Sequence, residues 1–268
     1  FCSGPPFGLQ HLTRPGYKEN MIFRGTKRIL RPGCGVSGTW FFPSSGVTGL
    51  LSVLLLGCQT GGGPAGPLIL DSRAQGVAED ALQGTMPESP VQITFDFQLR
   101  EADLRFSGRG VARVQPPYRL RIDLFSTRGE SLFRAALVGS ELRVPPGVPL
   151  DLAPPPALLW AALGVFRPDR EQRLLGGRSS SDDAMILHYG GAGTEELRFL
   201  LVDGGLKRAE ILKDGHLMEE VDLEFDASQS TVEETVYRNR ALFVELTFTL
   251  RSVENVDAFP EEIWDPGR

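Results

Sequence analysis

Apolar and polar residues alternate with a period of two over most of the chain after Pro90. In the stretch VQITFDFQL the apolar residues that share one face are Val91, Ile93, Phe95, Phe97 and Leu99. Successive side chains of a strand point to opposite faces, so such a stretch predicts a half-buried strand. About ten such stretches follow one another through short connections with turn signals. Among these signals are Asp203-Gly204 and Asp214-Gly215, and they favour antiparallel pairing.

Two segments depart from this alternation. The stretch PPPALLWAALGVF, residues 154–166, has prolines at its front and Gly164 near its end, which is typical of a helix. It is apolar on nearly every side, so we expect it to be buried. Residues 72–86 predict a second short helix, with Ser72 as its N-cap.

The sheet and the apolar helix together predict the fold. One face of every strand is apolar and needs a cover, and residues 154–166 are the only internal segment long enough to supply it. We therefore expect a mainly β fold, a curved antiparallel sheet that forms a half-open barrel with a covering helix. A filled core and a hollow that holds a ligand have the same sequence pattern, so both alternatives stand.

The N-terminal part contains an apolar run, Val47–Gly57, that ends at Cys58. The run is too short to span a bilayer, which takes about 20 apolar residues. It has the length of the apolar region of a secretory signal, about 7–15 residues. Basic residues lie upstream of it, between Arg24 and Arg31, as in such signals. We therefore leave residues 1–57 out of the fold.

The junction Leu55-Leu56-Gly57-Cys58 resembles the lipobox of bacterial lipoproteins. That resemblance implies that Cys58 is lipidated and becomes the N-terminus after cleavage. Gln59 in place of an aspartate then implies export to the outer membrane, with the domain anchored by lipid on the periplasmic face. The alternative is a buried core segment with an incidental cysteine.

The expected division of the chain follows from this junction. Residues 1–57 form the upstream segment and signal peptide, and residues 58–71 form the lipidated N-terminus and a flexible tether. A β domain of the predicted half-open barrel type covers 72–259, and 260–268 form a C-terminal tail. No internal repeat of 20–50 residues interrupts this plan.

Removal of the leader changes the charge of what remains. The leader holds six Lys or Arg residues and one acidic residue, which leaves 211 residues with 22 basic and 33 acidic side chains. This acidity argues against nucleic acid as a partner. Cys58 is the only cysteine left, so disulfides and thiol catalysis are not expected.

Signals of enzymatic chemistry are weak. His188 and His216 are the only histidines after the leader, and neither has a partner at a spacing typical of a metal site or a catalytic pair. Adjacent acidic residues such as Glu219 and Glu220 fall on strands, where neighbours point to opposite faces and cannot converge. We interpret these histidines as structural and these acids as solvated surface. We expect no enzyme, no cofactor and no metal.

Three stretches resemble the LolA/LolB family of lipoprotein carriers and receptors. They are YRLRIDLFSTRGESLFRAALVGSELRV, ALLWAALGVFRP and the closing ALFVELTFTL, and their order and spacing agree over roughly residues 72–255. The resemblance implies an incomplete barrel, closed by helices, that holds acyl chains in its hollow. A related group of outer-membrane lipoproteins with the same fold matches equally well.

The resemblance and the apolar faces together give a set of candidate site residues. We expect acyl chains to lie under residues 154–166, and the partner to be an acyl lipid or a lipoprotein bound by a monomer. The candidate lining of this cavity is Ile122, Leu124, Leu132, Trp160, Leu163 and Phe248. For Trp160 the alternative is an ordinary core tryptophan.

One position departs from the family pattern. LolB-type receptors carry an apolar hook residue just before the glycine of the loop after the strand RLxL, and Arg128 stands there in this chain. The departure predicts a lipid- or lipoprotein-binding protein that does not insert its cargo efficiently into a membrane. A scaffold lipoprotein that acts through its surface, without a ligand, is the alternative function.

Overall fold

One continuous antiparallel sheet forms the body of the molecule. The computed structural model describes residues 68–148, 153–181, 183–191, 193–226, 228 and 231–267. Within them, twelve strands pair in the order β5-β4-β3-β2-β1-β12-β11-β10-β9-β8-β7-β6. The strands are β1 Val91–Glu101, β2 Leu104–Gln115, β3 Arg119–Ser126, β4 Ser131–Val138, β5 Glu141–Arg143, β6 Arg173–Ser179, β7 Ala184–Gly190, β8 Glu195–Val202, β9 Gly205–Lys213, β10 His216–Phe225, β11 Val232–Asn239 and β12 Val244–Asn255. The helices are α1 Ser72–Gly84, α2 Pro156–Ala161 and the short 3₁₀ helix η2 Glu261–Trp264.

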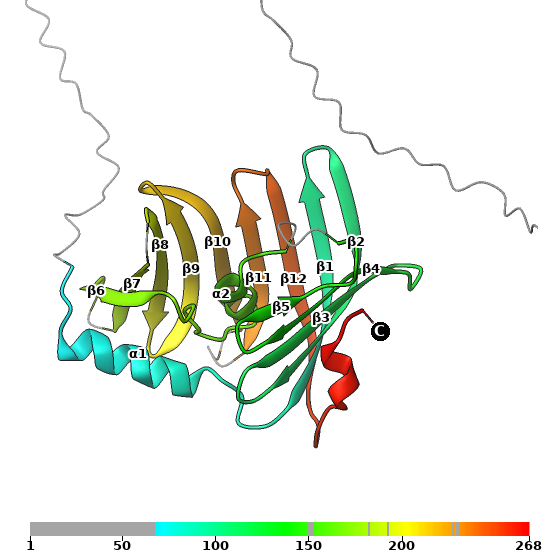
Figure 1. Cartoon of the computed structure of the whole chain (residues 1–268), viewed down its shortest axis with the longest axis horizontal. Helices are drawn as coiled ribbons and strands as arrows, with labels where there is room; N and C mark the ends of the chain where they lie inside the picture. The colour runs from blue at the N-terminus through cyan, green and yellow to red at the C-terminus, as the bar shows by residue number, and fades with distance from the viewer. Residues whose placement is uncertain are drawn as a thin grey trace, which may run out of the picture. The chain divides into compact units, whose positions relative to one another are not determined.

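The first and last strands pair with each other in the middle of the sheet. Because β1 lies beside β12, the two edges are β5 and β6, which are consecutive in sequence. The connection between these edge strands carries α2 across the concave face of the sheet (Figure 1). The edges do not pair, so the sheet is curved and open, as the sequence predicts, and it is not a closed barrel.

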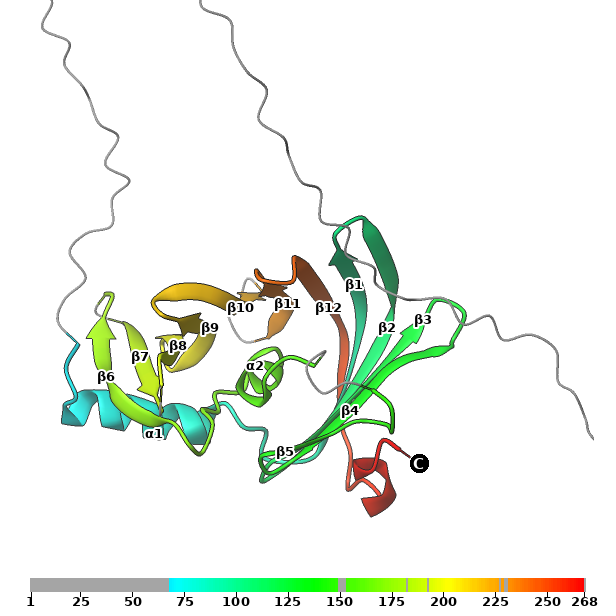
Figure 2. The same ribbon diagram turned by 45° about the horizontal axis from the view of Figure 1, so that its top comes forward.

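The concave face holds two apolar clusters, one for each half of the sheet, and α2 lies between them (Figure 2). Leu158 and Ala161 pack into the cluster of β7–β11, whereas Leu159 and Trp160 pack into the cluster of β1–β4. A helix that is apolar on every side can serve two cores at once. The covering helix predicted from the sequence is thus present.

This helix is much shorter than the predicted range 154–166. It begins at Pro156, whose fixed φ suits a first helical position, and ends at Ala161. The chain then turns at Gly164, whose φ of +78° lies in the left-handed region where glycine is not strained. Residues 162–166 are therefore a buried turn and not a continuation of the helix.

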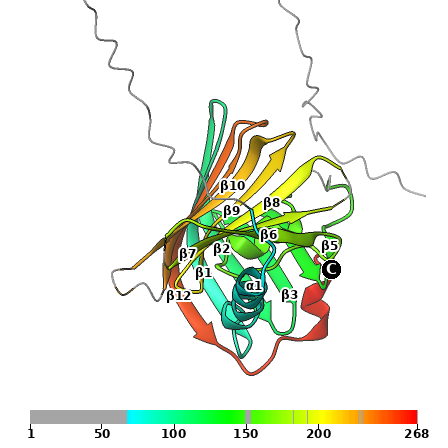
Figure 3. The ribbon, with the colours of Figure 1, turned by 90° about the vertical axis from the view of Figure 1, so that its left-hand side faces the viewer.

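The first helix covers the concave face of β6, β7 and β9, and Figure 3 looks along its axis. Its N-cap is Asp71, whose carboxylate accepts a hydrogen bond from the backbone N–H of Ala74 at 2.8 Å. The expected cap, Ser72, is instead the first helical residue. Just before the helix, Ile69 pairs with Gly177 of β6, so the end of the expected tether is held at the edge of the sheet.

Charged side chains connect the strands on the outer face. Arg238 of β11 contacts Glu245 of β12 at 3.0 Å and Asp222 of β10 at 2.9 Å. Glu245 also contacts Arg100 of β1 at 3.1 Å, and Asp222 contacts Arg208 of β9. The network therefore joins five strands by their side chains in addition to the backbone ladder.

The C-terminal segment packs on the outer side of β3 and β4. Trp264 is buried there. The ring of Phe259 meets its ring edge to face, with centroids 5.9 Å apart, and the guanidinium of Arg119 lies 5.8 Å from the centroid of the Trp264 ring. The first residues of the expected tail 260–268 thus pack against the sheet.

The part expected to be the leader, residues 1–57, lies outside the described residues, and so does Cys58. Among the residues that are described, no helix is long and apolar enough to cross a bilayer.

We predict that Asp123→Ala destabilises the fold by about 3 kcal/mol, the usual cost of leaving a buried charge unpaired. Asp123 is only 3% exposed and contacts Arg113 at 2.7 Å and Arg121 at 2.8 Å. Urea unfolding followed by circular dichroism measures the change. Asp96→Ala is the matched control, because Asp96 lies on the exposed outer face with Arg251. Equal shifts of the midpoint in both variants would contradict the prediction.

Candidate functional site

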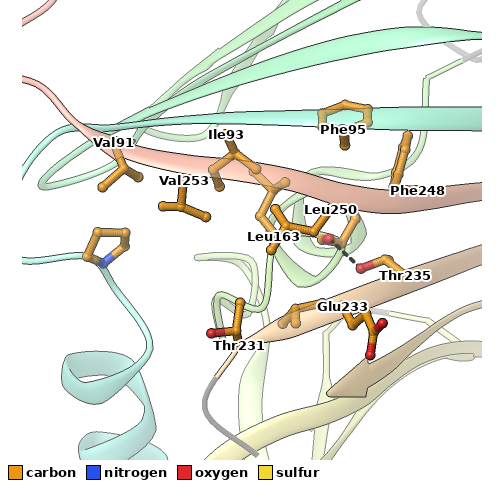
Figure 4. A pocket seen from close by; sticks show the side chains of 13 residues that line it. Val91, Ile93, Phe95, Leu163, Thr231, Glu233, Thr235, Phe248, Leu250 and Val253 are labelled. Carbon is orange, nitrogen blue, oxygen red and sulfur yellow. Dashed lines mark hydrogen bonds between the residues drawn. The ribbon is translucent and has the colours of Figure 1, made fainter. Parts of the chain in front are cut away.

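A pocket of about 410 Å³ opens on the concave face where the two halves of the sheet meet. Its walls come from the first half of β1, the second half of β12, the start of β11 and the turn after α2 (Figure 4). Most of the lining is apolar. The volume lies within the usual range of small-molecule sites, about 300–1,000 Å³. At this place the concave face is therefore hollow and not filled by side chains.

A bulge in β12 keeps the wall apolar along its whole length. Phe95 lies opposite Leu250 and Ile93 lies opposite Val253, so β12 has one more residue than β1 between the two pairs. The extra residue shifts the alternation by one position. Both Leu250 and Val253 consequently face the pocket, whereas regular alternation places them on opposite faces.

Phe95 and Phe248 close the inner end of the pocket. Their rings meet edge to face, with centroids 4.8 Å apart and an interplanar angle of 69°. The ring of Phe95 lies across Gly110 of β2, where an added Cβ would stand 2.1 Å from the nearest ring carbon. Gly110 thus lets the ring lie over β2 and leaves the space beside it open.

The turn after α2 forms the roof. The hydroxyl of Thr235 on β11 donates a hydrogen bond to the carbonyl oxygen of Ala162 at 3.0 Å, and this bond is buried. Leu163 projects from the same turn into the pocket (Figure 4). The next residue, Gly164, lies so close to Val232 that a Cβ would be 3.2 Å from its Cγ2. The roof is therefore fixed to β11 by one hydrogen bond and one close contact.

The mouth of the pocket carries its polar groups. Val253, Thr231 and Glu233 are all exposed at this end. Glu233 is the one charged residue of the described lining, and it has no ion pair among the described residues. Thr231 brings a hydroxyl that can both donate and accept a hydrogen bond.

The structure places the six predicted cavity residues in three different surroundings. Leu163 and Phe248 line the pocket. Ile122, Leu124 and Trp160 are buried in the cluster of the β1–β4 half, and Leu132 is half-exposed on β4, outside the pocket lining. A role for these residues in ligand binding stays a prediction.

Trp160 is fully buried in the cluster of the β1–β4 half, and its part in a ligand cavity stays a prediction. Its ring lies 5.7 Å from the guanidinium of Arg167, which stacks on Tyr118 at 3.4 Å. The indole N–H has no hydrogen-bond partner within the described part of the chain. The contacts of this tryptophan are therefore those of a packing residue.

Sequence reasoning missed most of the pocket. The alternation had identified the apolar face of β1, which includes Ile93, but it did not show that β12 lies beside it. The missed charged residue is Glu233, which was grouped with the solvated acids. No local pattern marked it, because β11 has a bulge between Val232 and Glu234, and Val232 packs into the concave core although it stands three residues before Thr235.

The loop that contains Arg128 is an exposed hairpin tip between β3 and β4. The hydroxyl of Ser126 accepts hydrogen bonds from the backbone N–H groups of Arg128 at 3.2 Å and Glu130 at 3.1 Å. Gly129 has a φ of +84°, which suits glycine in such a tip. The hydrogen bonds hold a charged tip in one conformation.

The two histidines and the Glu219–Glu220 pair lie away from the pocket lining. His188 is buried and contacts Glu196, which also binds Arg198 at 2.8 Å. Glu219 and Glu220 point to opposite faces, as expected, since Glu219 accepts a hydrogen bond from Tyr237 and Glu220 binds Arg240. Glu220 is buried, however, so its interpretation as solvated surface was wrong. Within the described residues, no group of three or more His, Cys, Asp or Glu side chains could hold a metal ion.

Comparison with known proteins gives matches only among solved structures. No family model matches the chain, and no curated protein matches its sequence. The chain is similar to a LolA superfamily protein from Nitrosomonas europaea, with 14% identity, 71% of this chain and 96% of that chain covered, and a TM-score of 0.48. It is also similar to a DUF1329 family protein from Desulfovibrio piger, with 8% identity, coverage of 72% and 97%, and a TM-score of 0.42.

A third similar structure is a putative outer-membrane lipoprotein-sorting protein domain from Vibrio parahaemolyticus, with 8% identity, coverage of 72% and 94%, and a TM-score of 0.39. Two of these three structures are named for the LolA superfamily or for lipoprotein sorting. At these identities and TM-scores the likeness carries no argument about function. The pocket itself has to carry that argument.

We predict that Glu219→Gln stabilises the fold at neutral pH. Burial raises the pKa of the Glu219 carboxyl above its usual value of 4.5, so its ionised form destabilises the folded state. Stability of the unmodified chain therefore rises as the pH falls through this raised pKa, and the advantage of the variant disappears in acid. Thermal unfolding at pH 7 and pH 4 measures both effects. The amide oxygen of glutamine can still accept the hydrogen bond from Tyr237, so an advantage that is equal at both pH values would contradict the assignment.

Proposed function

We propose that the domain binds an acyl chain in the pocket between β1, β12 and the turn after α2. The observation that carries this proposal is the open apolar hollow of about 410 Å³ on the concave face. Its walls are aliphatic and aromatic, and its polar residues stand at the mouth and at the hydrogen-bonded roof. An apolar chain with a polar end fits such a distribution of side chains.

The size of the pocket favours one chain and not a whole lipid molecule, because it lies near the lower end of the range for ligand sites. Each methylene group removed from water contributes about 0.8 kcal/mol. A segment of about six methylene groups would therefore contribute roughly 5 kcal/mol before the cost of ordering the chain. The head of the chain would lie at the mouth.

The proposed cellular setting follows from the sequence. Cys58 is proposed to carry the lipid anchor, and the domain to act at the outer membrane on its periplasmic face. The bound acyl chain would then belong to a lipid or a lipoprotein, and the protein would take part in lipoprotein localisation without catalysing a reaction. These statements rest on the lipobox resemblance and on the pocket.

We predict that Val253→Trp prevents ligand binding while the fold is kept. Val253 is 51% exposed at the mouth, so an indole can be placed there without overpacking a core. Binding of the neutral fluorescent probe N-phenyl-1-naphthylamine to the purified chain measures the effect, and we expect the affinity to fall by more than about tenfold. The loss of burial of two or three methylene equivalents is enough for this change.

Leu132→Trp is the matched control for this experiment. Leu132 is 49% exposed, nearly the same as Val253, but it lies on β4 outside the pocket lining. The control variant should bind the probe as the unmodified chain does. Equal loss in both variants, or no probe binding by any chain, would favour the alternative of a scaffold lipoprotein that acts through its surface.

We further predict that Arg128→Leu increases binding to lipid vesicles. The tip of the β3–β4 hairpin is charged, and arginine is costly to move into hydrocarbon, whereas leucine gains from insertion. Arginine can instead remain at the surface and contact phosphate groups. Sedimentation with vesicles, with Cys58→Ser in every chain, measures the effect without the lipid anchor.

Arg128→Gln separates charge from hydrophobicity in this assay, because it removes the charge and adds no apolar surface. We expect it to bind vesicles less than Arg128→Leu. If the unmodified hairpin already inserts, so that Arg128→Leu adds nothing, the proposed lack of insertion is wrong.

A further inference from the structure

We propose that Glu233 makes the pocket select acyl chains whose head carries no negative charge, such as ester- or amide-linked chains, over free fatty acids. This inference rests on the proposed function, because it concerns the ligand class of the same pocket. The observation behind it is the charge of the mouth, where Glu233 stands among apolar residues and hydroxyl groups.

Glu233 lines the pocket from a bulge in β11, between Val232 and Glu234. Thr235 lies opposite Phe248 on the concave face, and Glu233 comes two residues earlier on the same strand. Leu250 and Val253 are the apolar residues that share the pocket with it (Figure 4). A chain that inserts its apolar end between β1 and β12 therefore brings its head near this carboxylate.

Glu233 forms no ion pair with any side chain that the structure describes. The described lining contains no lysine, arginine or histidine. A fatty acid carboxylate at the mouth would thus meet a like charge with no counter-ion from the protein. Two negative charges within about 6–8 Å of each other near a protein surface weaken binding by roughly tenfold.

A neutral head meets groups at the mouth with which it can form hydrogen bonds. The hydroxyl of Thr231 stands at the same mouth and is able to donate a hydrogen bond to an ester or amide carbonyl. The carboxylate of Glu233 can accept a hydrogen bond from a hydroxyl or an amide N–H group of the head. The mouth therefore repels a free fatty acid and suits an acyl chain that is linked to glycerol or to an amine.

The test compares two ligands with the same chain. Dodecanoate and the monoacylglycerol of dodecanoic acid compete with N-phenyl-1-naphthylamine for the purified full chain at pH 8, each below its micelle concentration. We expect the monoacylglycerol to displace the probe at a roughly tenfold lower concentration than dodecanoate. High salt should reduce this difference, because ions screen the repulsion at an exposed mouth.

Substitutions assign the difference to one side chain. Glu233→Gln should raise the affinity for dodecanoate and so narrow the ratio of the two affinities, and Glu233→Lys should make dodecanoate the better ligand. Glu234→Gln is the matched control, with the same change of net charge. Glu234 hydrogen bonds with Thr249 on the outer face, so its substitution should not alter the ratio of affinities.

Two outcomes overturn the inference while the proposed function stands. One is equal affinity of the two ligands for the unmodified chain, and the other is an equal effect of the Glu233→Gln and Glu234→Gln variants on dodecanoate. Failure of both ligands and of the probe to bind would overturn the proposed function, and the inference with it.

Discussion

Every feature of this domain depends on how the apolar concave face of one long sheet is covered. Twelve strands present far more apolar surface than a helix of six residues, Pro156–Ala161, can shield. The open edges make this harder, because β5 and β6 do not pair and the sheet does not close on itself. The concave face is therefore covered in parts: two cores lie on either side of α2, and α1 packs over the β6–β7 edge. The pocket lies at the seam between the two cores.

Contacts on both the outer face and the concave face stabilise the register of the strands. On the outer face, the network around Arg238 and Asp222 spans β9 to β1, so that a shift of one strand would separate several ion pairs. On the concave face, glycine and aromatic residues complement each other, as Phe95 does with Gly110. A slip of the strand register by one residue would move every side chain to the other face, so the contacts on both faces disfavour it. The register that results is also the register that places Leu250 and Val253 at the pocket.

The sequence predicts the elements of this molecule better than their arrangement. Alternation identifies strands such as β1 and β3, and the apolar stretch with Trp160 identifies the covering helix, since both depend on local patterns. The pocket depends on a long-range pairing, β1 with β12, and on a bulge that no local pattern marks. The prediction had no such pairing to use and placed the cavity against Ile122 and Leu124, which are buried in the cluster of the β1–β4 half. Glu233 was missed for the same reason, because its surroundings come from three separate parts of the chain.

The hollow depends on the choice of side chains as well as on the path of the backbone. Protein interiors are packed as densely as organic crystals, so an open space in a wall of aliphatic residues is unusual for a core alone. At the mouth, Val253 is half-exposed, and at the inner end Gly110 leaves room for the ring of Phe95. A larger side chain at Val253 would fill part of the opening. The roof, moreover, is fixed by a buried hydrogen bond from Thr235 and does not collapse onto β12. A wall that leaves room, a roof that is held above it and a mouth with the Glu233 carboxylate are the three features on which we base the proposal of an acyl-chain site and of its selection by head charge.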